Sequence, residues 1–362
     1  MPVATARRPP RPAMLKGGTV APPGARRAGG GAAMQVSASV RAVQVPDDNP
    51  MHPQMTTIYL IGSGQVLTVD SGEALERYQW MLRGYLAAVE RAEIALAAVT
   101  HHHLDHAGNL KWLRETYGAE VLVHPEGPPL LEGKLPESGV RILRDGQVIE
   151  LGGGVRVQVL ETPGHSVDSL CFYLEDEGVL FTGDTLLGGT TTTVWDLGAY
   201  MASLERLLAL PHLTVICPGH GPLVREPRAW IQQYIDHRRM RERQILEVLA
   251  EGGEPTSWDI MLKVYGDIDP RLRRAAAGNV ETHLKKLERE GRVKVYPGVP
   301  RQQSEEERRQ AEEHARIRAE TIARAREYER EERRAALAAQ ENPPTERWEV
   351  MPRYALIGRP DE

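Results

Sequence analysis

Four of the twelve histidines in this 362-residue chain stand within six residues, in the segment HHHLDH at positions 101–106. His101 and His103 are two residues apart, so their side chains point to the same side if this segment is extended. Asp105 and His106 follow in a turn and can face a second point. The apolar residues 96–100 directly before the cluster predict a short strand that ends at it. We therefore expect the chain to fold around this cluster as a site for metal ions.

Three more candidate ligands follow, each in a turn after an apolar stretch. His165 ends the segment TPGH, Asp184 ends FTGD, and His220 lies in CPGHGP. A single histidine of this kind is more often an ordinary exposed or hydrogen-bonded residue, but chance explains the ordered set of five histidines and two aspartates poorly. Imidazole and carboxylate ligands suit zinc, with manganese or iron as alternatives, and a carboxylate can bridge two ions. The predicted site for two divalent metal ions comprises His101, His103, Asp105, His106, His165, Asp184 and His220.

Apolar runs and helical periodicity alternate from residue 40 to about residue 227, and several strands are adjacent in sequence. This alternation predicts a layered α/β (α+β) body, which we place at residues 34–230. Asp70, Ser71 and Gly72 are interpreted as a turn that closes a strand pair. The expected helices are 74–91 and 109–117, and the expected strands are 57–61, 65–69, 96–100, 121–123, 155–160, 170–174, 179–181 and 213–217.

The segments on either side of this body have a different character. Residues 1–33 belong to a stretch rich in Pro and Gly, and we expect a disordered tail there. Helical patterns at 228–250, 256–264 and 270–290, followed by a β-wing at 291–296, have the outline of a winged helix at 231–299. Residues 300–342 alternate acids and arginines, which predicts a charged, solvent-exposed helix at 304–340. A C-terminal tail at 343–362 is apolar enough at 348–357 to dock on another part of the chain, at a place that the sequence does not specify.

The order and spacing of the seven candidate ligands over residues 40–225 are similar to those of the metallo-beta-lactamase superfamily. This resemblance implies an αββα sandwich with a dinuclear site at one edge. The implied ligands of the first metal are His101, His103 and His165. The implied ligands of the second are Asp105, His106 and His220, with Asp184 as the bridge. Two such ions lower the pKa of a shared water toward ~7, so the resemblance implies a metal-dependent hydrolase with Asp105 and Asp184 as catalytic residues.

Further positions narrow the branch of the superfamily. Zinc beta-lactamases of the common class have a cysteine at the Asp184 position, and the flavodiiron branch has a glutamate at the His103 position, so we expect neither activity. A closer resemblance is to the lactamase-beta-like subfamily, which carries a C-terminal winged helix and includes a mitochondrial endoribonuclease; fungal polyketide thioesterases look similar too. Thr57 departs from this pattern, because relatives often have Asn there. The resemblance is carried by TVWDLGAYMASL at 193–204, PGHGP at 218–222, RERQIL at 241–246 and NVETHLKKLEREG at 279–291.

Three functions remain open. The favoured one is an endoribonuclease acting on single-stranded RNA, and the alternative enzyme is a thioesterase or glyoxalase-type hydrolase of acyl-thioesters or other small esters. A nucleic-acid-binding regulator is the non-enzymatic alternative, although residues 237–297 hold only thirteen Lys and Arg against ten Asp and Glu. The winged helix is equally well explained as a cover for the active-site cleft or as the contact of a homo-oligomer. The residues expected to touch phosphates are Arg271, Arg273, Arg274, Lys285, Lys286 and Arg289.

The other histidines and cysteines near the cluster have different expected roles. His102 points away from its neighbours and is expected at the rim of the site. His124 either supports a ligand or serves only the fold. Cys171 is expected in the core, and Cys217 near the site without binding metal.

Composition sets the remaining bounds. No run approaches the roughly 18 apolar residues that a membrane span needs, and the formal net charge of −5 indicates no particular partner. The two cysteines form neither a CxxC pair nor a disulfide framework, which favours a reducing compartment. We expect a cytoplasmic protein, or a mitochondrial one if the source is eukaryotic.

Overall fold

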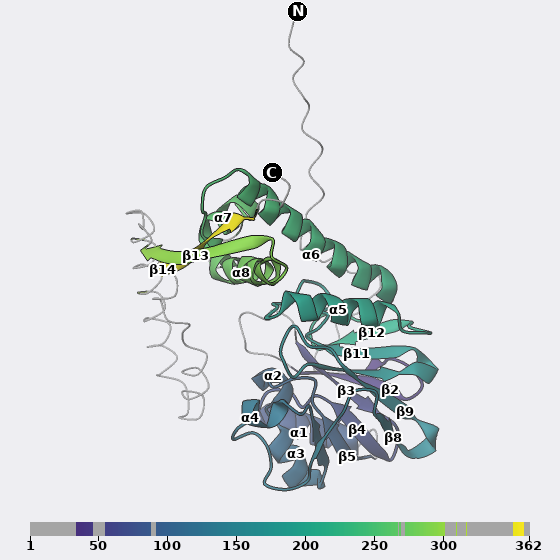
Figure 1. Cartoon of the computed structure of the whole chain (residues 1–362). Coiled ribbons are helices and arrows are strands. Elements are labelled where there is room, and N and C mark those ends of the chain that lie inside the picture. Colours follow the sequence, from purple (N-terminus) through teal and green to yellow (C-terminus); the bar gives the residue numbers. More distant parts are fainter. Residues whose placement is uncertain are drawn as a thin grey trace, which may run out of the picture.

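The computed structural model describes residues 34–45, 55–87, 92–266, 268, 272–300, 309, 316 and 350–357. Its body contains two sheets (Figure 1). The first has seven strands in the order β1 (Met34–Gln35), β2 (Val40–Val45), β3 (Thr56–Ile61), β4 (Gln65–Val69), β5 (Glu93–Ala98), β6 (Glu120–Val123) and β7 (Val140–Ile142). Neighbours from β1 to β4 are antiparallel, and those from β4 to β7 are parallel. The loops that follow β4, β5 and β6 therefore emerge at one edge.

The second sheet has five strands, in the order β12 (Val215–Pro218), β11 (Val179–Gly183), β10 (Leu170–Leu174), β9 (Arg156–Glu161) and β8 (Val148–Glu150). β11 and β12 are parallel, and β10 is antiparallel to both β9 and β11. The chain thus leaves β9, β11 and β12 at the same edge of this sheet.

The alternation of side chains along each strand builds three apolar layers. Tyr59 and Ile61 of β3 face the second sheet and pack with Phe172 and Phe181 in a central core. Ile58 and its neighbours face the other way, against α1 (Glu76–Tyr85) and α3 (Leu110–Tyr117). The outer side of the second sheet packs against α5 (Leu197–Leu208) and α6 (Pro227–Ala250). The order helix, sheet, sheet, helix is the expected αββα sandwich.

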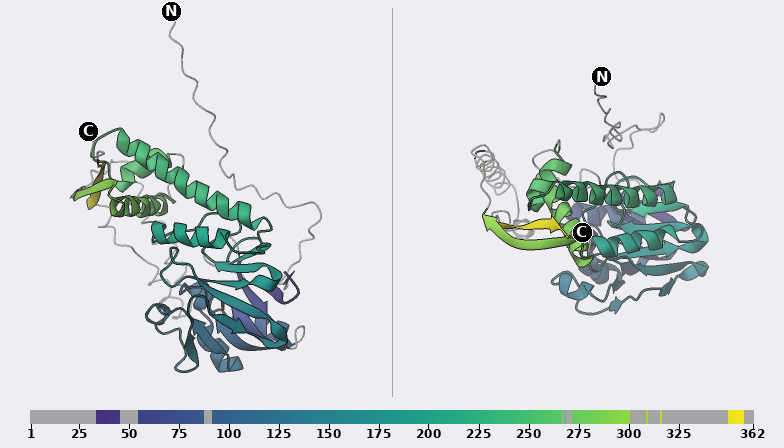
Figure 2. Two further views of the ribbon diagram at one scale, coloured as in Figure 1. Left: turned by 45° about the vertical axis from the view of Figure 1, so that its right-hand side comes forward. Right: turned by 45° about the horizontal axis from the view of Figure 1, so that its top comes forward.

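A smaller unit follows the body and shares α6 with it, as the two views of Figure 2 show. It consists of the end of α6, α7 (Ser257–Val264), α8 (Arg273–Arg289), β13 (Val293–Pro300) and β14 (Val350–Leu356) around a core of its own. Thr256 caps α7, accepting a hydrogen bond from the backbone of Asp259, whose side chain binds back to Thr256. Three helices and a two-stranded wing form the expected winged helix.

The C-terminal segment corrects one boundary. We expected residues 343–362 to form a tail separate from the winged helix. Instead β14 pairs antiparallel with β13, from Val293 opposite Leu356 to Pro300 opposite Val350. Met351 and Tyr354 are buried in the winged-helix core. The strand that completes the wing therefore comes from about 50 residues farther along the chain, too far for local sequence patterns to indicate the pairing.

Other differences from the expected elements are small or local. α1 is shorter than the expected helix 74–91, of which residues 88–91 lie outside the described residues. β5 begins and ends earlier than expected, and β2, β7, β8 and α5 were not predicted. The expected helix 304–340 lies outside the described residues except for Arg309 and Arg316. The remaining short elements are α2 (Leu104–Ala107), α4 (Gly127–Leu130), η2 (Gly152–Gly154) and η3 (Glu175–Glu177).

Candidate metal centre

Loops from both sheets bring the seven predicted ligands together at one edge of the sandwich. The first sheet supplies His101 and His103 directly after β5, and then α2 carries Asp105 and His106. These last two residues were expected in a turn and lie in a one-turn helix instead. The second sheet supplies the other three ligands after β9, β11 and β12, which are His165, Asp184 and His220.

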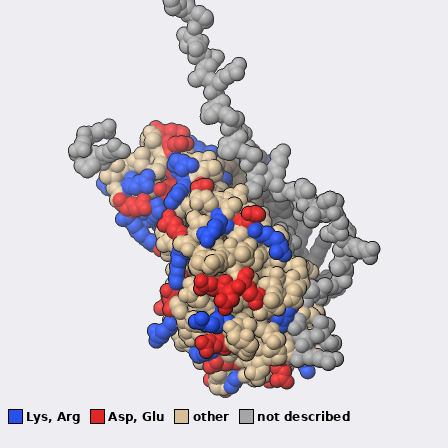
Figure 3. Space-filling view, turned by 90° about the vertical axis from the view of Figure 1, so that its right-hand side faces the viewer, with Lys and Arg blue, Asp and Glu red and all other residues tan. Residues whose placement is uncertain are grey.

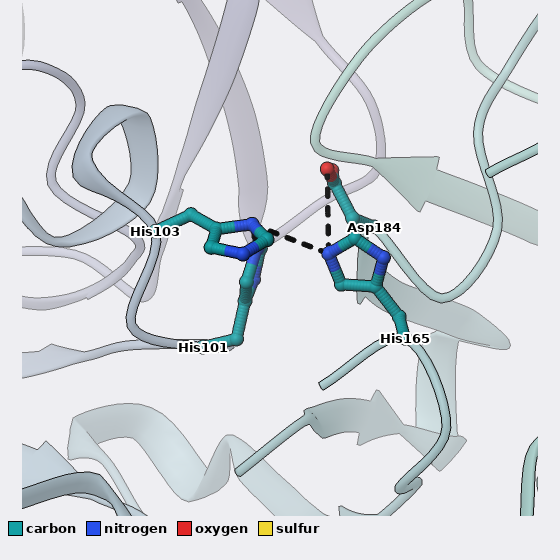
Figure 4. Close-up of side chains that lie close together, drawn as sticks. All are labelled: His101, His103, His165 and Asp184. Carbon is teal, nitrogen blue, oxygen red and sulfur yellow. Dashed lines mark hydrogen bonds and ion pairs between the residues drawn. The ribbon is translucent and has the colours of Figure 1, made fainter. Parts of the chain in front are cut away.

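Three of the histidines and one carboxylate form the first group, drawn in Figure 4. His103 Nδ1 lies 2.8 Å from His101 Nε2 and 3.3 Å from His165 Nε2. Oδ2 of Asp184 is 3.9 Å from His165 Nε2. One ligand atom from each of these residues lies within 4.8 Å of the others. The four side chains thus surround a single point.

Asp105, His106 and His220 form the second group. His220 Nε2 lies 3.0 Å from Asp105 Oδ2 and 3.3 Å from His106 Nε2. The other oxygen of Asp184, Oδ1, is 3.3 Å from His106 Nε2 and 3.5 Å from His220 Nε2. One oxygen of Asp184 therefore faces each group, which is the arrangement that a bridging carboxylate requires.

Hydrogen bonds on the outer sides of the rings direct their lone pairs inward. Asp70 Oδ2 accepts from His106 Nδ1 at 2.7 Å, and the carbonyl of Thr193 accepts from His165 Nδ1 at 2.9 Å. Because these outer nitrogens act as donors, Nε2 of each ring faces the centre and presents a lone pair there in the neutral form of the ring. Lone pairs and two carboxylates that converge on two points repel one another unless a metal cation or a proton, such as the one on His106, lies between them. The donor set therefore fits two divalent ions such as zinc.

Asp70 is the functional residue that the sequence analysis missed, since it was taken only as part of a turn. It directly follows β4 and adopts a left-handed backbone conformation, with φ of 67°. Its Oδ1 accepts from the backbone of Thr100 at 2.7 Å, and its Oδ2 accepts from the Thr100 hydroxyl at 3.0 Å. One carboxylate thus fixes both His106 and the start of the histidine segment. The sequence signal that could have identified Asp70 is its position at the end of β4. This strand pairs in parallel with β5, which leads to the histidine cluster.

Burial and neighbouring charges set the protonation states of the site. Burial lowers the pKa of His103 to about 3, with further lowering by His165. Burial and the neighbouring imidazoles hold the pKa of His101 well below its usual value. For Asp184, burial acts to raise the pKa, but His106 and the other imidazoles outweigh it and hold the pKa below its usual range. Neutral imidazoles and an ionised carboxylate are the forms that bind a divalent cation.

His106 and Asp105 are coupled through their charges. Burial acts to lower the pKa of His106, but Asp105, Asp70 and Asp184 together raise it well above the usual value. Burial acts to raise the pKa of Asp105, and His106 and His220 hold it well below its usual value. A proton on His106 thus balances the surrounding carboxylates, and a cation that took its place would release that proton.

Gly219 allows β12 to approach the centre closely. A Cβ atom at this position would lie 2.5 Å from His106 Cε1 and 3.0 Å from Asp184 Oδ1. Such distances are closer than non-bonded contact permits, so any larger residue would displace ligands of both groups. The backbone carbonyl of Gly219 also accepts a hydrogen bond from the amide of Thr57 at 2.7 Å, which ties the second sheet to β3.

The other residues singled out in the sequence lie outside the two groups. His102 is half-buried at the rim, where its Nδ1 lies 2.8 Å from Asp168 Oδ1. The His124 ring accepts a hydrogen bond from the amide of Glu126 and lies 3.8 Å from the Glu161 carboxylate, which indicates a role in the fold. The cysteines are both free and buried in the apolar cores, Cys171 beneath α5 and Cys217 between the sheets.

Two of the six residues expected on the basic face of the winged helix are engaged in ion pairs. Lys286 contacts Glu242 at 2.7 Å and Glu290 at 2.8 Å, and Arg289 contacts Asp196 at 2.6 Å. Arg273 is half-buried, Arg274 and Lys285 are exposed, and Arg271 lies outside the described residues. On the face of the molecule in Figure 3, Lys and Arg side chains are interspersed with Asp and Glu.

Comparison with known proteins agrees with this geometry. The family described as "Metallo-beta-lactamase superfamily" matches residues 52–220, and "Beta-lactamase associated winged helix domain" matches residues 256–301. The "Beta-lactamase-like protein 2 homolog" of Caenorhabditis elegans is 34% identical over 264 residues, covering 72% of this chain and 87% of the relative. The chain belongs to the metallo-beta-lactamase superfamily. Its Drosophila melanogaster relative of the same name is 35% identical over 274 residues, covering 73% and 92%.

Other members of the superfamily extend the comparison. An "Atrochrysone carboxyl ACP thioesterase" of Aspergillus fumigatus is 37% identical over 216 residues, covering 58% of this chain and 65% of the relative. A metallo-beta-lactamase family protein from Thermus thermophilus superposes with a TM-score of 0.60 at 26% identity, covering 72% of this chain and 97% of the other. A beta-lactamase domain protein from Burkholderia ambifaria shares the fold, with a TM-score of 0.65 at 21% identity. The match covers 73% of this chain and 90% of the other.

A membrane-spanning helix is not part of the described structure, because each helix there is too short or too polar to cross a bilayer.

Proposed function

We propose that this protein is a two-metal hydrolase that cleaves acyl thioesters. The observation that carries the proposal is the convergence of five imidazoles and two carboxylates into two adjacent groups that share Asp184. Divalent ions held there would polarise the scissile carbonyl and lower the pKa of a water molecule at the site. Zinc suits the donor set best, and manganese or iron are the alternatives.

The residues of the chain supply orientation and charge for this reaction. Asp105 and Asp184 are ionised at neutral pH, because neighbouring imidazoles hold the pKa of each carboxyl group below its usual range. A carboxylate in this state accepts a hydrogen bond from the attacking water and directs it toward the carbonyl carbon. Asp70 holds the His106 ring in place, so the reacting centre stays in a fixed geometry.

Neither Cys171 nor Ser166 has the surroundings of a catalytic nucleophile. Burial raises the pKa of Cys171 to about 11, so its thiol stays protonated at neutral pH. Ser166, Asp168 and His102 lie together, but Asp168 stands between the other two and contacts both. The imidazole therefore does not touch the serine hydroxyl as a catalytic triad requires. Water activation at the two groups needs neither of these side chains.

Two observations favour a thioester over RNA as the substrate. One relative, at 37% identity, is named as a thioesterase. In addition, Lys286 and Arg289 of the winged helix are bound to carboxylates of this chain, which reduces the positive charge available to a nucleic acid. Single-stranded RNA is the second candidate, supported by the winged helix itself and by the exposed Arg274 and Lys285. The same ion pairs disfavour a purely DNA- or RNA-binding regulator.

The test combines metal analysis with a substrate screen. Purified protein is expected to contain about two zinc-type ions per chain and to release free thiol from acyl-coenzyme A thioesters of several chain lengths. Fluorescent single-stranded RNA and lactones serve as the other substrates. Rapid cleavage of RNA at low salt with thioesters left intact would establish the second candidate, and active protein without a bound transition metal would overturn the two-metal proposal.

Adjacent histidines provide matched variants for this test. His103→Gln removes a ligand of the first group and should lower hydrolysis by at least ~100-fold, because loss of a residue that merely supports a ligand already costs about 10–100-fold. His102→Gln changes the neighbouring imidazole, which faces Asp168, and should leave metal content unchanged. Asp184→Asn should remove the bridge and abolish hydrolysis with the fold retained, as judged by circular dichroism.

A further inference from the structure

One face of the first half of α6 is hydrogen-bonded to the segment 187–192. Trp230, Tyr234 and Arg238 are spaced four residues apart, so their side chains lie in a row on the same face of the helix. Each binds a peptide group of this segment. Trp230 Nε1 donates to the Leu187 carbonyl at 2.9 Å. The Tyr234 hydroxyl accepts from the Leu187 amide at 3.0 Å and donates to the Thr190 carbonyl. Arg238 Nη2 donates to the Thr192 carbonyl at 2.5 Å.

The end of this segment holds one of the candidate metal ligands. The Thr192 hydroxyl lies 3.0 Å from His165 Nδ1, and the carbonyl of Thr193 accepts from the same nitrogen at 2.9 Å. These contacts fix the plane of the His165 ring, and with it the direction of the lone pair on Nε2. The peptide that Arg238 binds is therefore one residue or less from both groups that orient His165.

Arg238 is buried between the segment 187–192 and α5. The side chain is buried, with 3% of the residue exposed, and among the described residues Nη2 of its guanidinium donates to Thr192 whereas Nε has no hydrogen-bond partner. It lies 5.5 Å from the centre of the Tyr200 ring, whose hydroxyl donates to the carbonyl of Thr185 at 2.7 Å. A buried guanidinium is costly unless its hydrogen bonds are satisfied. Here the guanidinium contacts the segment 187–192, which ends beside His165. It also contacts the ring of Tyr200, whose hydroxyl is bound to Thr185, the residue after Asp184.

We infer that Arg238 is a positioning residue for the first metal group, acting through the Thr192 peptide on the orientation of His165. The inference rests on the proposed binding of metal ions at this centre. It also gives α6 a second role, because the same helix continues into the core of the winged helix through Ile245 and Leu249. Arg289 of α8 contacts Asp196 at 2.6 Å, four residues after Thr192. The winged-helix unit thus supports the loop that orients His165.

The test measures metal affinity separately from turnover. Cobalt is loaded into the full-length protein, its visible spectrum is recorded, and the two dissociation constants are obtained by competition with a chelator. Arg238→Met removes the hydrogen-bond donors but has a side chain of similar length. It should lower the affinity for one of the two ions by about 10–100-fold and leave the affinity for the other unchanged within error. Arg238→Lys retains one donor group and should have a smaller effect. Arg239→Met is the control, since that exposed side chain pairs with Glu205 on the surface.

A second variant keeps the inference testable if Arg238→Met does not fold. Thr192→Val removes the hydroxyl beside His165 and leaves Arg238 in place. It should lower the affinity for the same ion by about tenfold. If folded Arg238→Met or Thr192→Val binds both ions as tightly as the wild type, with an unchanged cobalt spectrum, the inference is wrong although the proposed function stands. Wild-type protein that binds no divalent ion would instead overturn the proposed function.

Discussion

Asp70 shows how a single side chain can organise a site that it does not enter. Its two oxygens bind the amide and hydroxyl of Thr100 and the outer nitrogen of His106. The residue reaches all three because its backbone is left-handed, a conformation that Asp tolerates better than most residues. The carboxylate thereby sets the ring orientation of a ligand in the second group and the position of the chain that leads to the first.

Replacing Asp70 with Asn should weaken metal binding without removing a ligand. The shape is retained, but the negative charge that holds the His106 ring is lost, so affinity for one ion should fall by about 10–100-fold. Isothermal titration of the metal-free protein with zinc measures this change. Asp168→Asn is the matched control, because that buried carboxylate binds His102, which is outside both groups. Equal metal affinities in the two variants would show that Asp70 has no special role.

At the scale of elements, the wing is completed by a strand from far along the chain. β14 pairs with β13, and Met351 and Tyr354 fill the core that α7 and α8 leave open. Without β14, β13 would be an isolated strand with unpaired backbone groups and an exposed apolar face. The integrity of the winged-helix unit therefore depends on residues that follow the charged segment.

Two shortened proteins distinguish the contributions of these segments. A chain ending at Pro300 lacks β14 and should lose stability in the winged-helix unit by at least the roughly 2–5 kcal/mol that removal of one large buried side chain costs. A chain lacking only residues 304–340, joined by a short linker, keeps β14 and should retain this stability. Limited proteolysis and urea unfolding followed by circular dichroism report the difference. If both shortened proteins resist proteolysis equally, β14 is dispensable.

His283 of α8 makes the stability of the winged-helix unit sensitive to acid. It is 1% exposed, and neither ring nitrogen has a hydrogen-bond partner among the described residues. Burial lowers its pKa to about 3, with further lowering by Arg238, Lys286, His237 and Arg241. An unfolded histidine has a pKa of about 6.5. Because the folded pKa is the lower one, the contribution to stability is complete above about pH 6.5 and is lost as pH falls toward about 3.

His283→Leu should therefore reduce the loss of unfolding free energy between pH 7 and pH 5 by roughly 1–2 kcal/mol. Urea unfolding at the two pH values measures it. His212→Asn serves as the control, because His212 is exposed and has a left-handed backbone that Asn accommodates. An acid dependence that is the same in the wild type and in His283→Leu would show that other groups cause it.

At the scale of the whole molecule, the candidate metal centre joins the two sheets. His101, His103, Asp105 and His106 come from the first sheet, whereas His165, Asp184 and His220 come from the second. Ions bound between them would cross-link the two halves of the sandwich. Any ion that binds the folded state and not the unfolded chain stabilises the fold.

Removal of metal should consequently lower the unfolding temperature of the whole body. An ion at a hundred times its dissociation constant contributes about 2.7 kcal/mol, which corresponds to a shift of roughly 5–10 °C for a body of this size. Differential scanning calorimetry with a chelator, followed by addition of zinc, measures loss and recovery. His103→Gln should show a smaller response than the wild type. An unfolding temperature that changes neither with the chelator nor with added zinc would contradict this account.

The sequence by itself determined the layered α/β body, the outline of the winged helix and the seven candidate ligands, because strand alternation, helical periodicity and ligand spacing are properties of neighbouring residues. The layer order αββα was implied by the resemblance to a known superfamily. Only the tertiary structure decided which distant groups meet. Asp70 reaches His106 across 36 positions, β14 reaches β13 from about 50 residues away, and Arg289 binds Asp196 across 93. Each of these contacts depends on how layers pack and which loops share an edge. Local patterns constrain the backbone of each element, but they do not specify its partner.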